Sequence, residues 1–195
     1  RVVDVRDRGG VAAFVKEASE GTGRVDILVN NAGGVVGQVG RPLEEVSLEE
    51  WQVVFDVNLT GAFNFSQAVV PGMKAMGWGR IVNISSGAGL RVSLTGIQAY
   101  ASAKAGQIGL TRQLAHELGP FGITVNCVAP GFIRCNPTTE KQWESYGKEG
   151  QERLVASIAT RRTGRPEDIS NAVLFFSSGS SEWITGQTLS VDGGR

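Results

Sequence analysis

Residues 24–34 read RVDILVNNAGG, and this stretch decides the fold class. A compact apolar run is followed directly by two asparagines and two glycines. Such a run is typical of a strand buried on both faces of a parallel sheet, ending in a loop. Parallel neighbours need crossover helices, so strands and helices are expected to alternate on either side of it.

The flanking sequence shows this alternation. Strands are expected at 2–5, 79–86, 123–132 and 186–194, and helices at 11–20, 47–77, 97–122 and 165–178, with one or two mobile helices within 138–160. The helix at 47–77 opens on a capping box, Ser47 with Glu50, and Pro71 is expected to kink it. With no repeat or linker, the pattern predicts a single domain over 1–195. The fold class is α/β, a doubly wound and mostly parallel sheet of the Rossmann type.

Composition narrows the class of function. The formal net charge is zero, 41% of residues are hydrophobic and 19% are charged, without a basic run. Binding to nucleic acid or to a membrane surface is therefore not expected. No apolar stretch reaches transmembrane length, and two cysteines, Cys127 and Cys135, form no disulfide framework. We expect a cytoplasmic protein, with Cys127 in the core.

Three small-residue loops follow predicted strands: NNAGG at 30–34, SSGAG at 85–89 and APGFI at 129–133. In an open parallel sheet the ligand lies at the carboxyl ends of the strands, so these loops are expected to gather at one edge. Their small residues allow the backbone to approach a flat ligand closely.

Tyr100 and Lys104 are four residues apart on the predicted helix 97–122 and so share one face. Two charges about 4 Å apart interact by roughly 4 kcal/mol at an effective dielectric of about 20, which is roughly three pKa units. Lys104 is therefore expected to lower the pKa of the Tyr100 phenol toward neutrality, apart from an opposing effect of burial. A nearby serine hydroxyl would complete a donor pair for an oxygen that gains charge. Alone, this Tyr–Lys spacing is also common in surface helix contacts.

Seven short motifs occur in one order along almost the whole chain. They are DV at 4–5, NNAG at 30–33, DVNLTG at 56–61, IVNISS at 81–86, YASAK at 100–104, NCVAPG at 126–131 and SVDGG at 190–194. In these motifs the chain resembles the short-chain dehydrogenase/reductase family, in its single-domain branch, and is similar to 3-oxoacyl-ACP reductases. The resemblance implies an NAD(P)-dependent oxidoreductase that acts on a carbonyl or secondary alcohol, with a 3-oxoacyl thioester as a candidate substrate.

The same resemblance implies roles for individual residues. Tyr100 would be the general acid/base, and Lys104 would bind the nicotinamide ribose and lower the Tyr100 pKa. Ser86 would orient the substrate oxygen, and Asn58 would hold a water that relays protons. The dinucleotide, NAD or NADP, would also contact Asp4, Val5, Asn30, Ala32, Gly33, Pro130, Gly131 and Ile133. A homotetramer is implied as well, formed through the two long helices and the carboxy-terminal strand. No metal site is implied.

The chain departs from the family pattern at three places. The glycine-rich turn and the first two strands and helices are missing, so we expect an amino-terminally truncated domain in which strand 2–5 stands apart from the other strands. The loop from Ser86 to Tyr100 is one residue longer than usual, which leaves Ser85 as an alternative catalytic serine. Cys135 stands where the family often has Thr, a better hydrogen-bond donor.

Other readings remain open at this stage. A non-catalytic nucleotide-binding relative or scaffold is one alternative, and an inactive fragment of the enzyme is another. His116 is expected to be solvated, without a catalytic role. Trp143 and Tyr146 are expected to pack within a lid rather than to contact substrate.

Overall fold

The computed structural model describes residues 1–93 and 95–195, and its centre is a parallel sheet of four strands. The strands are β1 (Ile27–Asn30), β2 (Gly79–Ile84), β3 (Ile123–Pro130) and β4 (Thr188–Val191), in the order β1-β2-β3-β4. All three pairings are parallel, with Asn30 opposite Asn83 and Pro130 opposite Val191, so the carboxyl ends of the strands lie at one edge of the sheet. This confirms the predicted doubly wound α/β fold.

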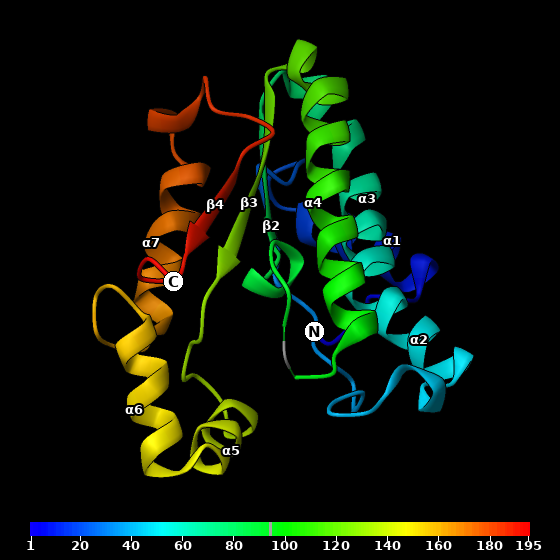
Figure 1. Cartoon of the computed structure of the whole chain (residues 1–195). Helices are drawn as coiled ribbons and strands as arrows, with labels where there is room; N and C mark the ends of the chain where they lie inside the picture. Colours follow the sequence, from blue (N-terminus) through cyan, green and yellow to red (C-terminus); the bar gives the residue numbers. More distant parts are fainter. Residues whose placement is uncertain (94) are drawn as a thin grey trace.

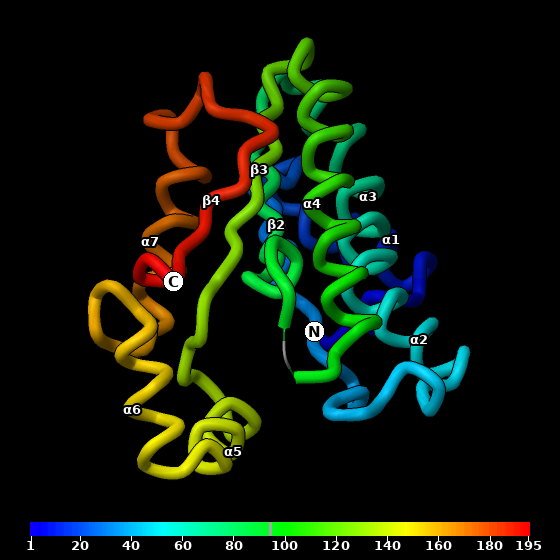
Figure 2. Tube along the Cα trace, in the orientation of Figure 1, coloured from blue at the N-terminus to red at the C-terminus, as the bar shows by residue number. Residues whose placement is uncertain are grey.

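Helices cover both faces of the sheet (Figure 1). They are α1 (Arg8–Ser19), α2 (Leu48–Phe55), α3 (Gly61–Met76), α4 (Gln98–Leu118), α5 (Pro137–Ser145), α6 (Gly147–Ser157) and α7 (Pro166–Ser177). Helices α3 and α4 pack on one face, with α1 against α3, while α7 packs on the other face against β2, β3 and β4. The Cα trace in Figure 2 shows α5 and α6 as a lobe that projects beyond the ends of the strands.

Two apolar clusters hold these layers together, one on each face of the sheet. On one face, Ile81 and Val125 pack with Met73 of α3 and Leu118 of α4. On the other face, Val82, Ile84 and Val128 pack with Phe176 of α7. Consecutive residues of β2 thus enter opposite cores, which explains why every residue of this strand is buried.

The predicted strand at 2–5 is wrong. These residues form no strand, and the chain turns at Val5 and Arg6. The Asp4 carboxylate accepts hydrogen bonds from the Arg6 guanidinium at 2.7–3.1 Å, and the Asp4 carbonyl accepts from the Asp7 amide at 3.0 Å. These local bonds favour a turn, and no described strand lies alongside to supply a ladder. The exposed edge of β1 therefore carries Ile27 and Val29, which are 44% and 40% exposed.

The predicted helix at 47–77 consists of three parts. The capping box is confirmed, since the Glu50 amide donates to Ser47 Oγ at 3.2 Å and the Ser47 amide donates to Glu50 Oε2 at 3.0 Å. One π-helical turn, Asp56–Thr60, separates α2 from α3. Helix α3 runs through Pro71, so the irregularity lies at this π turn rather than at the proline. A π turn changes the direction of side chains, and such turns are frequent at functional sites.

The remaining predicted elements are present at slightly different bounds. Helix α4 gives way at Gly119 to one 3₁₀ turn, as the Gly-Pro pair predicts, and α7 has Pro166 at its first position. No helix within the described residues is both long and apolar enough to cross a bilayer.

Candidate active site

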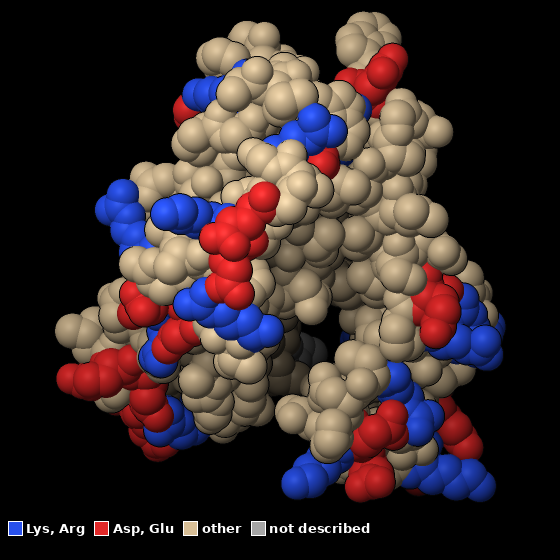
Figure 3. All heavy atoms as spheres, turned by 180° about the vertical axis from the view of Figure 1, so that it is seen from behind, with Lys and Arg blue, Asp and Glu red and all other residues tan. Residues whose placement is uncertain are grey.

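The carboxyl ends of β2 and β3 lead into the loops that sequence analysis singles out. The space-filling view shows that the molecule is hollowed between the α5–α6 lobe and the part that carries α2 (Figure 3). The turn Gly87–Gly89 after β2 lies against α4, close to Lys104 and Ala105. A Cβ on Gly87 would lie 3.4 Å from the Pro130 carbonyl oxygen, so the loops after β2 and β3 are in contact. The predicted gathering of these loops is therefore observed.

Lys104 is the buried cation of this site, with only 3% of its surface exposed. Its Nζ donates to the Ile84 carbonyl oxygen at 2.7 Å and to Gln107 Oε1 at 3.3 Å. An ammonium carries three N–H donors, so one remains for a ligand. Burial lowers the pKa of Lys104 to about 8, since water no longer stabilises its charge.

Tyr100 lies one helical turn before Lys104, and its ring centroid is 5.7 Å from Lys104 Nζ. Burial raises the pKa of the Tyr100 phenol, and the neighbouring Ser86 hydroxyl opposes this shift in part. The direction is opposite to the predicted lowering by Lys104. The reason is that the ammonium is bound to the main chain of β2 and does not contact the phenolic oxygen, so desolvation outweighs its attraction.

The two serines after β2 occupy different environments. Ser85 is buried, and its hydroxyl donates to the Lys104 carbonyl oxygen at 2.8 Å. Ser86 is partly exposed, and its hydroxyl accepts from the Ala88 amide at 3.2 Å. The same hydroxyl lies close enough to the Tyr100 phenol to lower its pKa. This geometry favours Ser86 as the serine that faces a substrate, because the Ser85 hydroxyl is engaged inside the fold.

Asn58 lies in the π turn and is completely buried. Its Nδ2 donates to the carbonyl oxygens of Gly34 and Val54, both at 2.8 Å, and its Oδ1 accepts from the Gly34 amide at 3.0 Å. A Cβ on Gly33 would lie 2.4 Å from Asn58 Oδ1 and 3.2 Å from Lys104 Nζ. Asn58, Lys104 and the loop after β1 therefore meet at one point, which only glycine can occupy.

Asn30 belongs to a buried polar chain that crosses the sheet. Its Nδ2 donates to Asn83 Oδ1 at 2.8 Å and to Ser66 Oγ at 3.3 Å, and Asn83 Nδ2 donates to Thr111 Oγ1 at 2.9 Å. These hydrogen bonds connect β1, β2, α3 and α4 beneath the loops. The side chain of Asn30 is thus engaged inside the protein, which leaves its backbone for any ligand contact.

The loop after β3 packs against the α5–α6 lobe. Ile133 pairs with Gly164 in a single parallel bridge, and the Gly164 amide donates to the Phe132 carbonyl oxygen at 3.0 Å. The Phe132 ring lies 6.2 Å from Trp143 and 5.9 Å from Tyr146. Both aromatic side chains of the lobe therefore pack against the loop after β3, consistent with the packing role expected for them.

Of the other predicted residues, Ala32 and Gly33 are exposed in the loop after β1, and Pro130 and Gly131 are half-buried at the end of β3. Asp4 and Val5 lie beside the start of α3, where a Cβ on Gly61 would meet the Val5 side chain at 2.7 Å. The Asp4 carboxylate is occupied by Arg6, and the Val5 carbonyl oxygen accepts from Asn64 Nδ2 on α3 at 3.0 Å.

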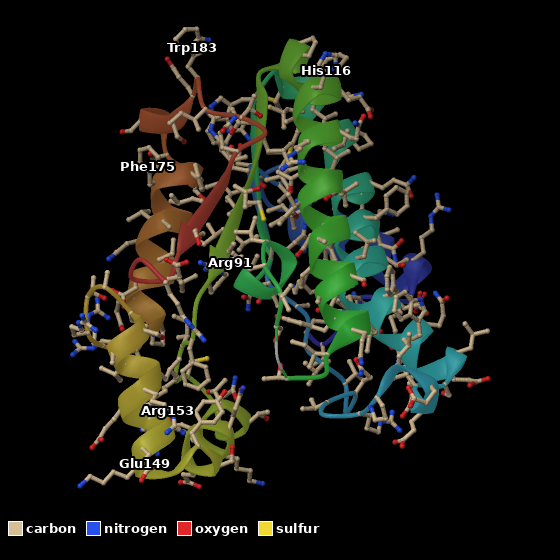
Figure 4. The ribbon with its side chains drawn as sticks, viewed as in Figure 1. Arg91, His116, Glu149, Arg153, Phe175 and Trp183 are labelled. Carbon is tan, nitrogen blue, oxygen red and sulfur yellow. The ribbon has the colours of Figure 1, made fainter. Side chains whose placement is uncertain are left out.

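Sequence analysis missed two members of the site region. Gln107 follows Lys104 by three residues on α4, a spacing that helical periodicity alone could have indicated. Arg91 donates to Asp192 at 2.5 Å and joins the loop after Ser86 to the end of β4. Burial raises the pKa of the Asp192 carboxyl, but its hydrogen bonds from Ser190, Gly194 and Arg91 outweigh burial and lower this pKa to about 2. Arg91 and Asp192 are 101 positions apart, and no local pattern links them. Figure 4 shows Arg91 beside the turn that follows β2, and His116 at the opposite end of α4.

The pKa of Lys104 predicts how stability depends on pH. Between about 8 and the model-peptide value of 10.5, the unfolded chain binds the proton and the folded chain releases it. The free energy of unfolding should therefore rise with pH across this window, by on the order of 3 kcal/mol. Urea unfolding of the wild type and of Lys104→Met at pH 8 and pH 10 measures this difference. The exposed Lys148→Met is the control, and equal pH dependence of all three proteins would refute the assignment.

Comparisons with known proteins agree with this geometry. The family model described as Enoyl-(Acyl carrier protein) reductase matches residues 1–195. The chain is 43% identical to BbsD of Thauera aromatica, a subunit of a hydroxy(phenyl)methylsuccinyl-CoA dehydrogenase, over 100% of this chain and 74% of that protein. It is 40% identical to the 3-oxoacyl-acyl-carrier-protein reductase FabG of Thermotoga maritima, over 99% of this chain and 75% of FabG. The crystal structure of levodione reductase superposes with a TM-score of 0.90 at 31% identity, over 99% of this chain and 75% of that one.

Proposed function

Because the chain belongs to the short-chain dehydrogenase/reductase family, a family of NAD(P)-dependent oxidoreductases, we propose that it interconverts a carbonyl and a secondary alcohol at Tyr100. The observation that carries this proposal is the placement of the Tyr100 phenol beside Ser86 and one helical turn from the buried Lys104. The proposed substrate class is 3-oxoacyl thioesters, supported by the similarity to FabG and to a CoA-thioester dehydrogenase.

Tyr100 serves as the proton donor in the direction of reduction. Since burial raises the pKa of its phenol, the group keeps its proton at neutral pH and can give it to a carbonyl oxygen. The Ser86 hydroxyl binds the same oxygen, so that two donors stabilise the charge that develops on it. In the reverse direction the same phenol must first lose its proton, which requires help from a nearby positive charge.

In this proposal Lys104 binds the cofactor and Asn58 transfers protons, and both roles assist Tyr100. The third N–H of the Lys104 ammonium is free to bind the ribose hydroxyls of the nicotinamide nucleotide. A bound nicotinamide supplies or accepts the hydride. Asn58 relays protons through a water at Oδ1, the atom that borders Gly33 and Lys104, while its amide nitrogen holds the Gly34 loop.

The residues present fit a dinucleotide, either NAD or NADP. The absence of a side chain at Gly33 leaves open the space between the β1 loop and Lys104. In the proposal, Asn30, Ala32 and Gly33 face the adenosine half, and Pro130, Gly131 and Ile133 flank the nicotinamide. Asp4 and Val5 approach the adenine. The direct test follows oxidation of NADH and of NADPH with a panel of ketones and 3-oxoacyl thioesters, and no oxidation with any of them would reject the proposal.

The choice between the two serines gives a sharp prediction. Ser86→Ala should lower kcat by about 10²-fold, because one of two donors to the substrate oxygen is lost. Ser85→Ala should change kcat little and instead lower the unfolding midpoint, since a buried hydrogen bond to the Lys104 carbonyl disappears. Steady-state kinetics and thermal unfolding of both variants measure this. A large loss of kcat for Ser85→Ala alone would make Ser85 the catalytic serine.

We also propose that the protein self-associates. The family resemblance implies contacts through the two long helices and the carboxy-terminal strand, and the exposed apolar side chains favour β4 and add α7. Leu174 and Phe175 on α7 and Leu189 on β4 are 69%, 41% and 42% exposed, and Figure 4 shows Phe175 on the outer side of the helix. Apolar side chains gathered in this way mark association surfaces. A homotetramer is the proposed assembly, and a monomer by sedimentation would reject it.

A further inference from the structure

An arginine-rich cavity of about 370 Å³ lies where the loop after β3 meets the start of α5 and the loop before α7. It is lined by Arg134, Glu140, Arg162, Thr163, Gly164 and Arg165. The bridge between Ile133 and Gly164 joins its two walls. The cavity therefore adjoins the same loop, Pro130–Ile133, that borders the proposed active site on its other side.

Two of the three guanidinium groups are held in place by carboxylates. Arg134 donates to Glu140 at 2.7 Å, and Arg162 donates to Asp168 at 2.6 Å. Arg134 also lies over the Trp143 ring, 5.0 Å from its centroid. These contacts fix the directions of two guanidiniums before any ligand arrives, which reduces the entropy that binding would cost.

The third guanidinium, that of Arg165, makes no hydrogen bond or ion pair with another described residue. Glu140 and Asp168 pair with Arg134 and Arg162, and Glu144 also acts on Arg134, so the Arg165 guanidinium is the positive charge left without a hydrogen-bonded carboxylate among the described residues at this cavity. Guanidinium groups match the oxygens of a phosphate with paired N–H donors, so this charge and geometry select a phosphate ester.

We propose that the cavity binds a phosphate group of a ligand whose reacting end lies at Tyr100. Gly87, next to Ser86, contacts the Pro130 carbonyl oxygen, so a ligand that follows residues 130–133 from Ser86 reaches the cavity. A thioester of coenzyme A or of phosphopantetheine carries its phosphates far from the carbonyl, and a dinucleotide carries a pyrophosphate. The identity of the reacting end rests on the proposed function, whereas the phosphate site does not.

The test is calorimetric titration with coenzyme A and with pantetheine, which lacks phosphate. The wild type is expected to bind coenzyme A, while pantetheine binds at least tenfold more weakly. Arg165→Ala should weaken binding of coenzyme A by about tenfold, as expected for a lost charge-assisted hydrogen bond. The control is Arg153→Ala on α6. The Arg153 side chain is 74% exposed, pairs with Glu149 one turn earlier on α6 at 3.5 Å (both labelled in Figure 4) and does not line the cavity, so its loss should leave binding unchanged.

Equal binding of the two compounds, equal binding by the wild type and Arg165→Ala, or no binding of coenzyme A would each overturn the proposal. Repeating the titration with saturating NADPH identifies the source of the phosphate. Persistent binding of coenzyme A assigns the site to the thioester tail, and displacement assigns it to the dinucleotide, and both results uphold a phosphate site. Because the titration needs no turnover, a protein that binds coenzyme A through Arg165 but reduces no thioester would refute only the proposed function.

Discussion

Tyr100→Phe should lower kcat for carbonyl reduction by about 10²- to 10⁴-fold, the usual contribution of one positioned proton donor. The phenol is the group beside Ser86 whose raised pKa keeps it protonated. Phe has nearly the same shape, so the ring can keep its place on α4. We therefore expect KM for the dinucleotide to change little while kcat falls, and steady-state kinetics separates the two.

The second tyrosine of the chain is a matched control for this substitution. Tyr146 lies between α5 and α6, where its hydroxyl accepts from Gln142 Nε2 at 2.7 Å. Tyr146→Phe removes one hydroxyl from the neighbouring lobe but none from the catalytic group. Its kcat should stay within about threefold of the wild type, since a typical hydrogen bond contributes about 1 kcal/mol or less. A comparable loss in both variants would mean that the Tyr100 effect reflects packing.

Gly33→Ala should lower kcat/KM by about 10- to 100-fold, with most of the loss in KM for the dinucleotide. The added methyl carbon would lie 2.4 Å from Asn58 Oδ1, an atom fixed by three hydrogen bonds of its side chain. Relief of such overpacking typically costs 1–3 kcal/mol, here by moving Asn58 or Lys104. The backbone at Gly33 does not require glycine, so the expected effect is purely steric.

The adjacent glycine provides the control. A Cβ on Gly34 would meet no atom within 4 Å, and its backbone bonds to Asn58 do not involve a side chain. Gly34→Ala should therefore keep kcat/KM within about twofold. Equal kinetics for Gly33→Ala and the wild type would show that the contact between Asn58, Lys104 and the β1 loop plays no part in catalysis.

Much of the fold could be predicted because the strands are short apolar runs and the helices carry their own start and stop signals. The Ser47 capping box and the Gly119-Pro120 stop act within a few residues, so local sequence determines them. The strand expected at 2–5 failed because a strand needs a neighbour, and Asp4 and Arg6 satisfy each other locally instead. The π turn at Asp56–Thr60 was not predictable, since nothing in DVNLT differs from an ordinary helix.

The sequence was a better guide to which residues form the candidate site than to their hydrogen bonds and pKa values. Spacing on one helix places Tyr100 and Lys104 together, but it does not reveal that Lys104 bonds to Ile84 or that burial raises the pKa of Tyr100. Asn30 was expected to contact a ligand, but its side chain donates a hydrogen bond to Asn83. This hydrogen bond depends on the register of β1 and β2, which the sequence does not reveal. Contacts such as Arg91 with Asp192 depend on the tertiary fold alone.

The central claim is that the Tyr100 phenol gives its proton to a carbonyl oxygen as the dinucleotide is oxidised. Single-turnover absorbance of reduced nicotinamide, with the protein in excess over NADH or NADPH and a saturating 3-oxoacyl thioester, tests it most directly because product release does not contribute. The account predicts rapid loss of the reduced-nicotinamide signal in the wild type and in Tyr146→Phe, and a loss at least 10²-fold slower in Tyr100→Phe. Equal rates in Tyr100→Phe and the wild type would contradict it.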